Sequence, residues 1–160
     1  MAGTKRKDLI VSTSQGQTKH STTNGSPMED VTHDVTHVTI KVSGSNDDSI
    51  TGICEGAFEN NPAIQMVEIS EGVTSIGKEA FAGCISLDCI RIPSSVTVIH
   101  ECAFSGCCAL TSIQIPSTVI EIGGKAFNLC TRLRSVDFCC QTSSTGRKRE
   151  SGLENNGVML

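Results

Sequence analysis

Cysteine is the residue type in this chain best suited to chemistry, because the 160 residues include nine cysteines alongside four histidines. Three of the cysteines, Cys84, Cys107 and Cys130, recur at intervals of 23 residues. In a structure that repeats with this period, their Cα atoms would lie about 5 Å apart on successive rungs, which allows a disulfide or a ladder of thiolates. We favour a third interpretation, in which each is a small, polarisable side chain buried inside a turn.

The other cysteines give weak signals for metal binding or nucleophilic attack. The adjacent pairs at 107–108 and 139–140 lack the Cys-x-x-Cys spacing of zinc sites. Cys89 is the most accessible candidate thiol, because the strand pattern described below places it on the solvent side. No neighbouring base marks it as a nucleophile.

Two segments with histidine contain the right residue types in the wrong arrangement. His33 and His37 are four residues apart with no third ligand nearby, so we interpret them as surface residues. His100, Glu101 and Cys102 have catalytic residue types, but adjacency in sequence is not the spatial arrangement that those roles need. The sequence also lacks the common nucleophile, phosphate-loop, zinc-protease and dinucleotide motifs. We therefore expect no catalytic residue, no metal site, no cofactor and no enzyme.

A 23-residue repeat organises the chain from Ser49 to Cys139. The stretch from Glu71 to Pro93 is its clearest copy, and four copies follow one another without a gap. Periods of this length are typical of solenoids. Eight columns of residues recur at the same step: Ile50, Val73, Val96, Val119; Ile53, Ile76, Ile99, Ile122; Ala57, Ala80, Ala103, Ala126; Phe58, Phe81, Phe104, Phe127; Asn61, Cys84, Cys107, Cys130; Ile64, Leu87, Leu110, Leu133; Val67, Ile90, Ile113, Val136; Ile69, Ile92, Ile115, Phe138.

Each copy predicts two short extended pieces joined by a turn. Residues 89–92 alternate, so Ile90 and Ile92 should point inward and Arg91 toward solvent, in a parallel strand that a proline ends. Residues 73–77 predict a second extended piece, with a left-handed glycine at 77 and at 123. Residues 78–82 are compatible with about one helical turn, after which Gly83 and Gly106 redirect the chain.

The segment IPSSVTVIHECAFSGCCALTSIQIP, residues 92–116, resembles the BspA-type leucine-rich repeat, and the resemblance covers residues 49–139. It implies an α/β, horseshoe-like solenoid, mainly of short parallel strands that line the concave face, with helical turns on the outer side. Members of that family act mostly as recognition surfaces, and some are cell-surface adhesins. The first copy reads Asn60-Asn61-Pro62 and the fourth has Leu129 where a glycine is usual, as expected for end repeats.

The segments outside the repeats have different compositions. Residues 1–30 are polar and predict a disordered tail. Residues 31–48 predict a capping strand, with Val38, Ile40 and Val42 on one face, followed by a polar insertion at 43–48. Residues 140–160 predict a second disordered tail. The last rung then lacks a cap, so self-association at that edge, a partner that completes the stack and an incomplete chain all remain open.

Charge and hydropathy limit the partners and the compartment. A net charge of −4 gives no sign of nucleic-acid binding. The longest apolar run near the start, Leu9–Val11, is far too short for a signal peptide or a membrane span. We therefore expect no membrane span, and reduced thiols in the cytoplasm or nucleus.

The exposed strand positions are where a protein partner would bind. A solvated sheet stabilised by its own cross-strand pairs is the competing interpretation. The sequence thus predicts a non-enzymatic, intracellular interaction scaffold, and the alternative is a cell-surface or secreted adhesion module. The candidate partner-binding residues are Met66, Glu68, Cys89, Arg91, Ser112, Gln114, Ser135 and Asp137.

Overall fold

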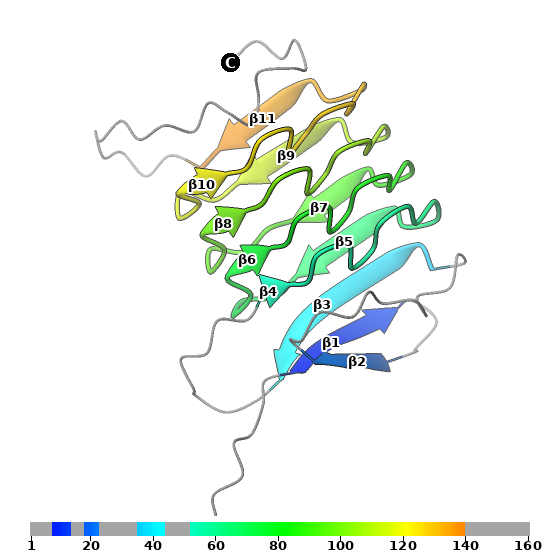
Figure 1. The fold of residues 1–160 in the computed structure, drawn as a ribbon, viewed down its shortest axis with the longest axis vertical. Helices are drawn as coiled ribbons and strands as arrows, with labels where there is room; N and C mark the ends of the chain where they lie inside the picture. The colour runs from blue at the N-terminus through cyan, green and yellow to red at the C-terminus, as the bar shows by residue number, and fades with distance from the viewer. Residues whose placement is uncertain (1–7, 14–17, 23–34, 44–51, 140–160) are drawn as a thin grey trace, which may run out of the picture.

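The computed structural model describes residues 8–13, 18–22, 35–43 and 52–139. The repeats form a solenoid of four rungs, one rung being one 23-residue turn of the chain (Figure 1). Each rung contributes one longer and one very short strand. The longer strands are β5 (Met66–Ile69), β7 (Cys89–Arg91), β9 (Ser112–Ile115) and β11 (Ser135–Phe138), and the short ones are β4 (Gly52–Ile53), β6 (Ser75–Ile76), β8 (Val98–Ile99) and β10 (Glu121–Ile122).

Successive rungs are joined by parallel strand pairing, as the sequence predicts. Val67 pairs with Ile90, and Ile76 pairs with Ile99, so the register equals the 23-residue period. The columns found in the sequence are therefore columns in space. Their aliphatic members fill the interior between the two rows of strands, where nearly all of them are buried.

The predicted helical turns on the outer side are wrong: the described residues contain no helix. The segments at these places, residues 55–60, 78–83, 101–106 and 124–129, are turns, called outer turns from here on. Each holds two residues with positive φ, as at Glu79 (54°) and Gly83 (71°), and such residues interrupt the right-handed φ/ψ run that a helix requires.

In the outer turns alternate backbone N–H groups bond to the next rung. In the second rung the N–H groups of Glu79, Phe81 and Gly83 donate to the carbonyl oxygens of Glu101, Ala103 and Ser105, at 3.0, 2.8 and 2.7 Å. The outer turns of the first and third rungs repeat this set. The N–H groups between them bond within the turn, as from Ala82 to Glu79 at 3.0 Å, so every second N–H that a helix would pair internally is paired between rungs.

Gly77 and Gly123, which precede two outer turns, do not have the left-handed backbone expected of them. They are glycines because the preceding rung lies too close for a side chain. A Cβ on Gly77 would lie 2.7 Å from the carbonyl carbon of Cys54, and one on Gly123 would lie 2.6 Å from that of His100. The adjacent Gly124 has nothing within 4 Å of its Cβ position.

Four phenylalanines form a continuous stack beneath the outer turns. The ring centroids of Phe58, Phe81, Phe104 and Phe127 are separated by 5.1, 5.5 and 5.5 Å, with interplanar angles of 7° or less. All four side chains are buried. Offset stacking at this spacing adds to the burial of apolar area, so this column contributes strongly to rung-to-rung packing.

The cysteine column is buried and reduced, in agreement with the packing interpretation. Cys84, Cys107 and Cys130 are free thiols. Each Sγ donates to the carbonyl oxygen of a phenylalanine in the preceding rung, at 3.1, 3.2 and 3.1 Å. In the first rung Asn61 occupies this position, and its Oδ1 accepts hydrogen bonds from the N–H groups of Ala63 and Ile64, at 3.0 and 3.3 Å.

A further strand precedes the first rung, within the segment assigned to a capping strand. β3 (His37–Ser43) pairs in parallel with β5, with Val38 opposite Val67 and Ile40 opposite Ile69. Val38 and Val67 are 29 residues apart, which is the 23-residue period plus the six residues of the insertion at 43–48. β3 therefore takes the place of the longer strand of a further rung.

Part of the segment expected to be disordered forms strands. β1 (Asp8–Thr13) pairs antiparallel with β3, and β2 (Thr18–Thr22) pairs antiparallel with β1 (Figure 1). The physical reason is the edge of β3, whose open backbone groups bind the Leu9–Val11 segment as a strand. The rest of residues 1–30 and the predicted tail at 140–160 lie outside the described residues.

Candidate functional site

The candidate site is the exposed side of β3, β5, β7, β9 and β11, called the strand face from here on. Side chains alternate along these strands, so each strand presents two positions to solvent. All eight positions predicted from the sequence lie on this face; Cys89 and Ser135 are half-buried, and the other six are exposed. They form two columns: Met66, Cys89, Ser112 and Ser135, and Glu68, Arg91, Gln114 and Asp137.

β3 adds positions that sequence reasoning missed. His37 stands opposite Met66 and Thr39 opposite Glu68, so each column begins one strand earlier than expected. His37 is exposed and Thr39 is half-buried. The six-residue insertion hides this relationship, because it moves β3 out of the 23-residue register.

The strand face is interrupted between β7 and β9. β3, β5 and β7 belong to one sheet, whereas β9 and β11 form a separate two-stranded sheet. On the opposite side of the solenoid β4, β6, β8 and β10 remain one continuous sheet through the same rungs. The interruption therefore concerns only the strand face.

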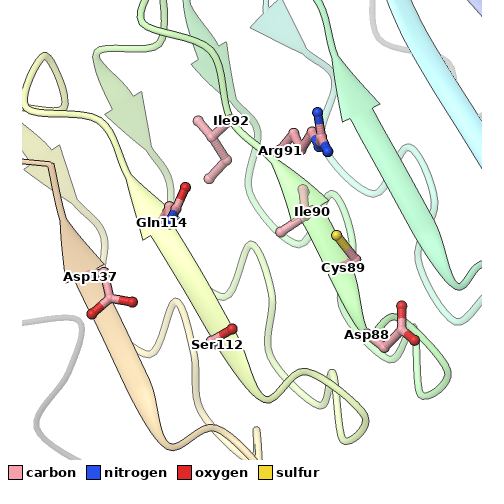
Figure 2. Close-up of a pocket in the computed structure, with 8 residues that line it drawn as sticks. All are labelled: Asp88, Cys89, Ile90, Arg91, Ile92, Ser112, Gln114 and Asp137. Carbon is pink, nitrogen blue, oxygen red and sulfur yellow. The ribbon is translucent and has the colours of Figure 1, made fainter.

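A depression of about 430 Å³ lies over this interruption. Its apolar lining comes from Ile90 and Ile92, and Figure 2 shows these side chains between β7 and β9. Ile92 is half-buried, whereas Ile69 and Ile115, its equivalents in the neighbouring rungs, are 4% and 0% exposed. The expectation that Ile92 points fully into the core thus holds only in part.

Polar side chains line the rest of this depression. Arg91 lies on one side of the two isoleucines, and Gln114 and Asp137 lie on the other (Figure 2). Asp88, Cys89 and Ser112 complete the lining. Within the described part of the chain Arg91 and Asp137 form no ion pair. The charges of the depression are therefore available to a ligand.

A second depression, of about 470 Å³, continues beyond the ends of β7 and β9. It shares Ile92 and Gln114 with the first and adds residues such as Ser94 and Pro116. Ser94 donates to the Glu71 carboxylate of the preceding rung through its hydroxyl (2.9 Å) and its N–H (3.2 Å). These bonds, together with those from Ser95, lower the pKa of Glu71.

The accessible thiols differ from the one singled out in the sequence. Cys89 is only half-buried, whereas Cys139, which lines the second depression, is exposed. Cys139 directly follows β11 at the end of the last repeat. This position after the strand was the feature of the sequence that could have indicated its exposure. Neither thiol lies in a group of residues that could hold a metal ion among the described residues.

The sequence neighbours His100, Glu101 and Cys102 lie at and just before an outer turn, away from the strand face. Cys102 has a positive φ of 53° and is half-buried. Burial and the carboxylates of Glu101 and Glu79 raise the pKa of its thiol. A raised pKa lowers the thiolate fraction, which is the opposite of what a nucleophile needs.

Burial raises the thiol pKa values of the cysteine column more strongly than that of Cys102. It raises the pKa of Cys84 and of Cys130 to about 12, and raises that of Cys107 as well. These thiols stay protonated at neutral pH and serve as hydrogen-bond donors. Their role is therefore in packing and hydrogen bonding.

Residues 39–149 match the family model of the BspA type leucine-rich repeat region, in six copies. The chain belongs to this family. No curated protein matches this BspA-type chain. No helix in the ranges given above is long and apolar enough to cross a bilayer.

Solved structures of other repeat proteins resemble this BspA-type solenoid. The pneumococcal vaccine antigen PcpA is 30% identical, with a TM-score of 0.54 over 55% of this chain and 22% of the antigen. A leucine-rich repeat protein from Bacteroides capillosus ATCC 29799 is 26% identical, with a TM-score of 0.57 over 75% of this chain and 86% of that protein. The chain thus spans about a fifth of the length of the antigen.

Proposed function

We propose that this chain is a non-enzymatic recognition module of the cell surface or the extracellular space, and that it binds a protein partner through the strand face. The observation that carries the proposal is the contrast between a buried, repeated interior and a strand face whose exposed residues differ from rung to rung. A rigid solenoid holds such residues at fixed spacing, which lowers the entropy lost on binding.

The surface location rests on similarity. The pneumococcal protein described as a vaccine antigen shares 30% of its residues over the aligned part, and an antigen of this kind is a target of antibodies. BspA-type repeats are in general binding repeats without catalytic function. These likenesses favour the adhesion alternative over the intracellular scaffold expected from the sequence.

An intracellular scaffold remains the second candidate because of one specific observation. Every cysteine in the described part of the chain is a free thiol, and Cys139 among them is exposed. Exposed free thiols are better suited to a reducing compartment than to the cell exterior. Antibodies raised against residues 52–139 separate the two: labelling of intact cells supports the surface module, and labelling only after permeabilisation supports the scaffold.

Charge reversal tests binding through the strand face. The double variant Glu68→Lys and Arg91→Glu inverts two charges on this face, and the matched control Lys78→Glu and Glu79→Lys inverts a 3.7 Å ion pair in an outer turn. We expect a partner captured from secreted and surface protein fractions by the wild-type chain to be lost with the first variant and retained with the second. Equal binding by all three chains would contradict the proposal.

A further inference from the structure

We propose that the interruption between β7 and β9 is the docking point on the strand face, and that it binds an extended peptide segment in which an aliphatic residue lies between an acidic and a basic residue. This inference rests on the proposed function and adds the position and chemistry of the contact. Elsewhere on the face, β3–β5, β5–β7 and β9–β11 are paired in a continuous ladder.

The aliphatic residue follows from the opened core. At this interruption an interior column opens between two buried members, because Ile92 is half-buried while Ile69 and Ile115 are almost completely buried; Phe138, in the last rung, is half-buried as well. A partner's aliphatic side chain placed against Ile92 would remove the remaining apolar area from water. Polar positions surround this contact, which is the usual arrangement of a small anchor pocket with a polar rim.

The acidic residue follows from Arg91. Its guanidinium is exposed, lines the depression and forms no ion pair with the residues that the structure describes. A guanidinium binds a carboxylate through two parallel hydrogen bonds, a geometry that lysine does not offer. A carboxylate beside the aliphatic side chain would therefore find its partner already at the rim.

The basic residue follows from Asp137 on the opposite side. Asp137 is exposed and lines the same depression, two strands away from Arg91. Two strand spacings amount to about 10 Å, which is the distance that three residues of an extended peptide cover at roughly 3.3 Å each. The ligand pattern is thus an acidic residue and a basic residue three positions apart, with the aliphatic residue between them.

A displayed library of randomised linear peptides, selected on the immobilised full chain, tests this pattern. We expect enrichment of Asp or Glu three positions from Lys or Arg with an aliphatic residue between them. Selection on the Arg91→Glu variant should replace the acidic residue by a basic one. Because Arg91 is exposed, this variant keeps the fold. Enrichment without this pattern, no enrichment, or the same peptides from both chains would overturn the proposal.

A pair of bulky variants tests the position. Gln114→Trp fills the depression, whereas Lys41→Trp places the same bulk on β3, at an exposed position outside the candidate binding residues. Fluorescence anisotropy with a selected peptide measures the Kd of each variant against that of the wild-type chain. We expect the Kd to rise about tenfold for the variant that fills the depression and less than about twofold for the control variant. Equal weakening by both would place binding elsewhere on the strand face, which would overturn this inference and leave the proposed function standing.

Discussion

The two sides of the solenoid differ in how strictly they repeat. On the outer-turn side, strand pairing, the phenylalanine stack and the thiol bonds pass through all four rungs without a break. On the strand face the sheet divides between β7 and β9, and the exposed residues change from Glu68 to Arg91 to Gln114. The outer side carries the periodic packing, which leaves the strand face free to vary.

The largest expected effect is loss of a ring from the phenylalanine stack. Phe104→Ala removes the ring that lies 5.5 Å from both Phe81 and Phe127, and should lower the free energy of unfolding by about 3–5 kcal/mol. Urea denaturation of the full chain measures this change in the free energy of unfolding. The control on the strand face is Ser112→Ala, which should change stability by less than about 0.5 kcal/mol. Similar losses in both variants would remove the contrast between the two sides.

Alkaline pH should weaken the outer side next. The thiol pKa of Cys84 and Cys130 is about 12 in the folded chain against an ordinary value of 9.0, so thiolate forms first in the unfolded chain. The stability that the folded chain gains from keeping these two thiols protonated is complete below pH 9. It is lost as the pH rises toward 12, by up to about 1.4 kcal/mol per pH unit for each thiol. Urea midpoints at pH 8–10.5 measure it. Cys84→Ala should give a shallower decline, and an unchanged slope would contradict this origin.

A methyl group between rungs should have a smaller effect. Gly123→Ala forces a Cβ against the backbone of His100 and Glu101, and should destabilise the chain by about 1–3 kcal/mol. Gly124→Ala adds the same methyl group to open space one residue later, and should be neutral or slightly stabilising. Thermal unfolding of the two variants gives the comparison directly. If the two melt together, close rung-to-rung approach is not what selects glycine at position 123.

The smallest expected effect is a gain. Leu129 has φ = 57° in a position where two other rungs have glycine, and its side chain is 62% exposed. Leu129→Gly should relieve the left-handed strain and stabilise the chain by about 1 kcal/mol. The reverse test is Gly106→Ala at φ = 76°, which should cost a similar amount. Thermal unfolding measures both, and a less stable Leu129→Gly variant would show that the exposed leucine makes contacts that outweigh the strain.

The sequence predicted the parts of this fold that repeat. Columns at a 23-residue step required stacked parallel strands, and the register of Val67 with Ile90 agrees with them. Helical turns were predicted wrongly because Glu79, Cys102 and Lys125 adopt positive φ without being glycine, and nothing in their residue types indicates it. β3 was expected only as a cap, because its 29-residue offset conceals its equivalence to the strands that follow.

The candidate site was predictable only in outline. Alternation along the strands placed the eight exposed positions on one face. The interruption beside Ile92 had no signal, because Ile92 is the same residue type as Ile69 and Ile115, whose side chains are buried. Such a local opening depends on how neighbouring strands pair in three dimensions, and a column of identical residues does not record it.

The hydrogen bonds between outer turns all point in one direction along the stack. Between outer turns the N–H group belongs to the earlier rung and the carbonyl oxygen to the later one, as from Phe58 to Ala80 and from Phe104 to Ala126. Peptide dipoles aligned in this way add along an axis, each of about 3.5 D, as they do in an α-helix. The outer turns therefore point their positive pole toward the C-terminal rung, the reverse of an α-helix. At the ends of the strands the N–H group belongs to the later rung, as from His100 to Ile76 and from Gly123 to Ile99, so the two sets of dipoles oppose each other across the solenoid.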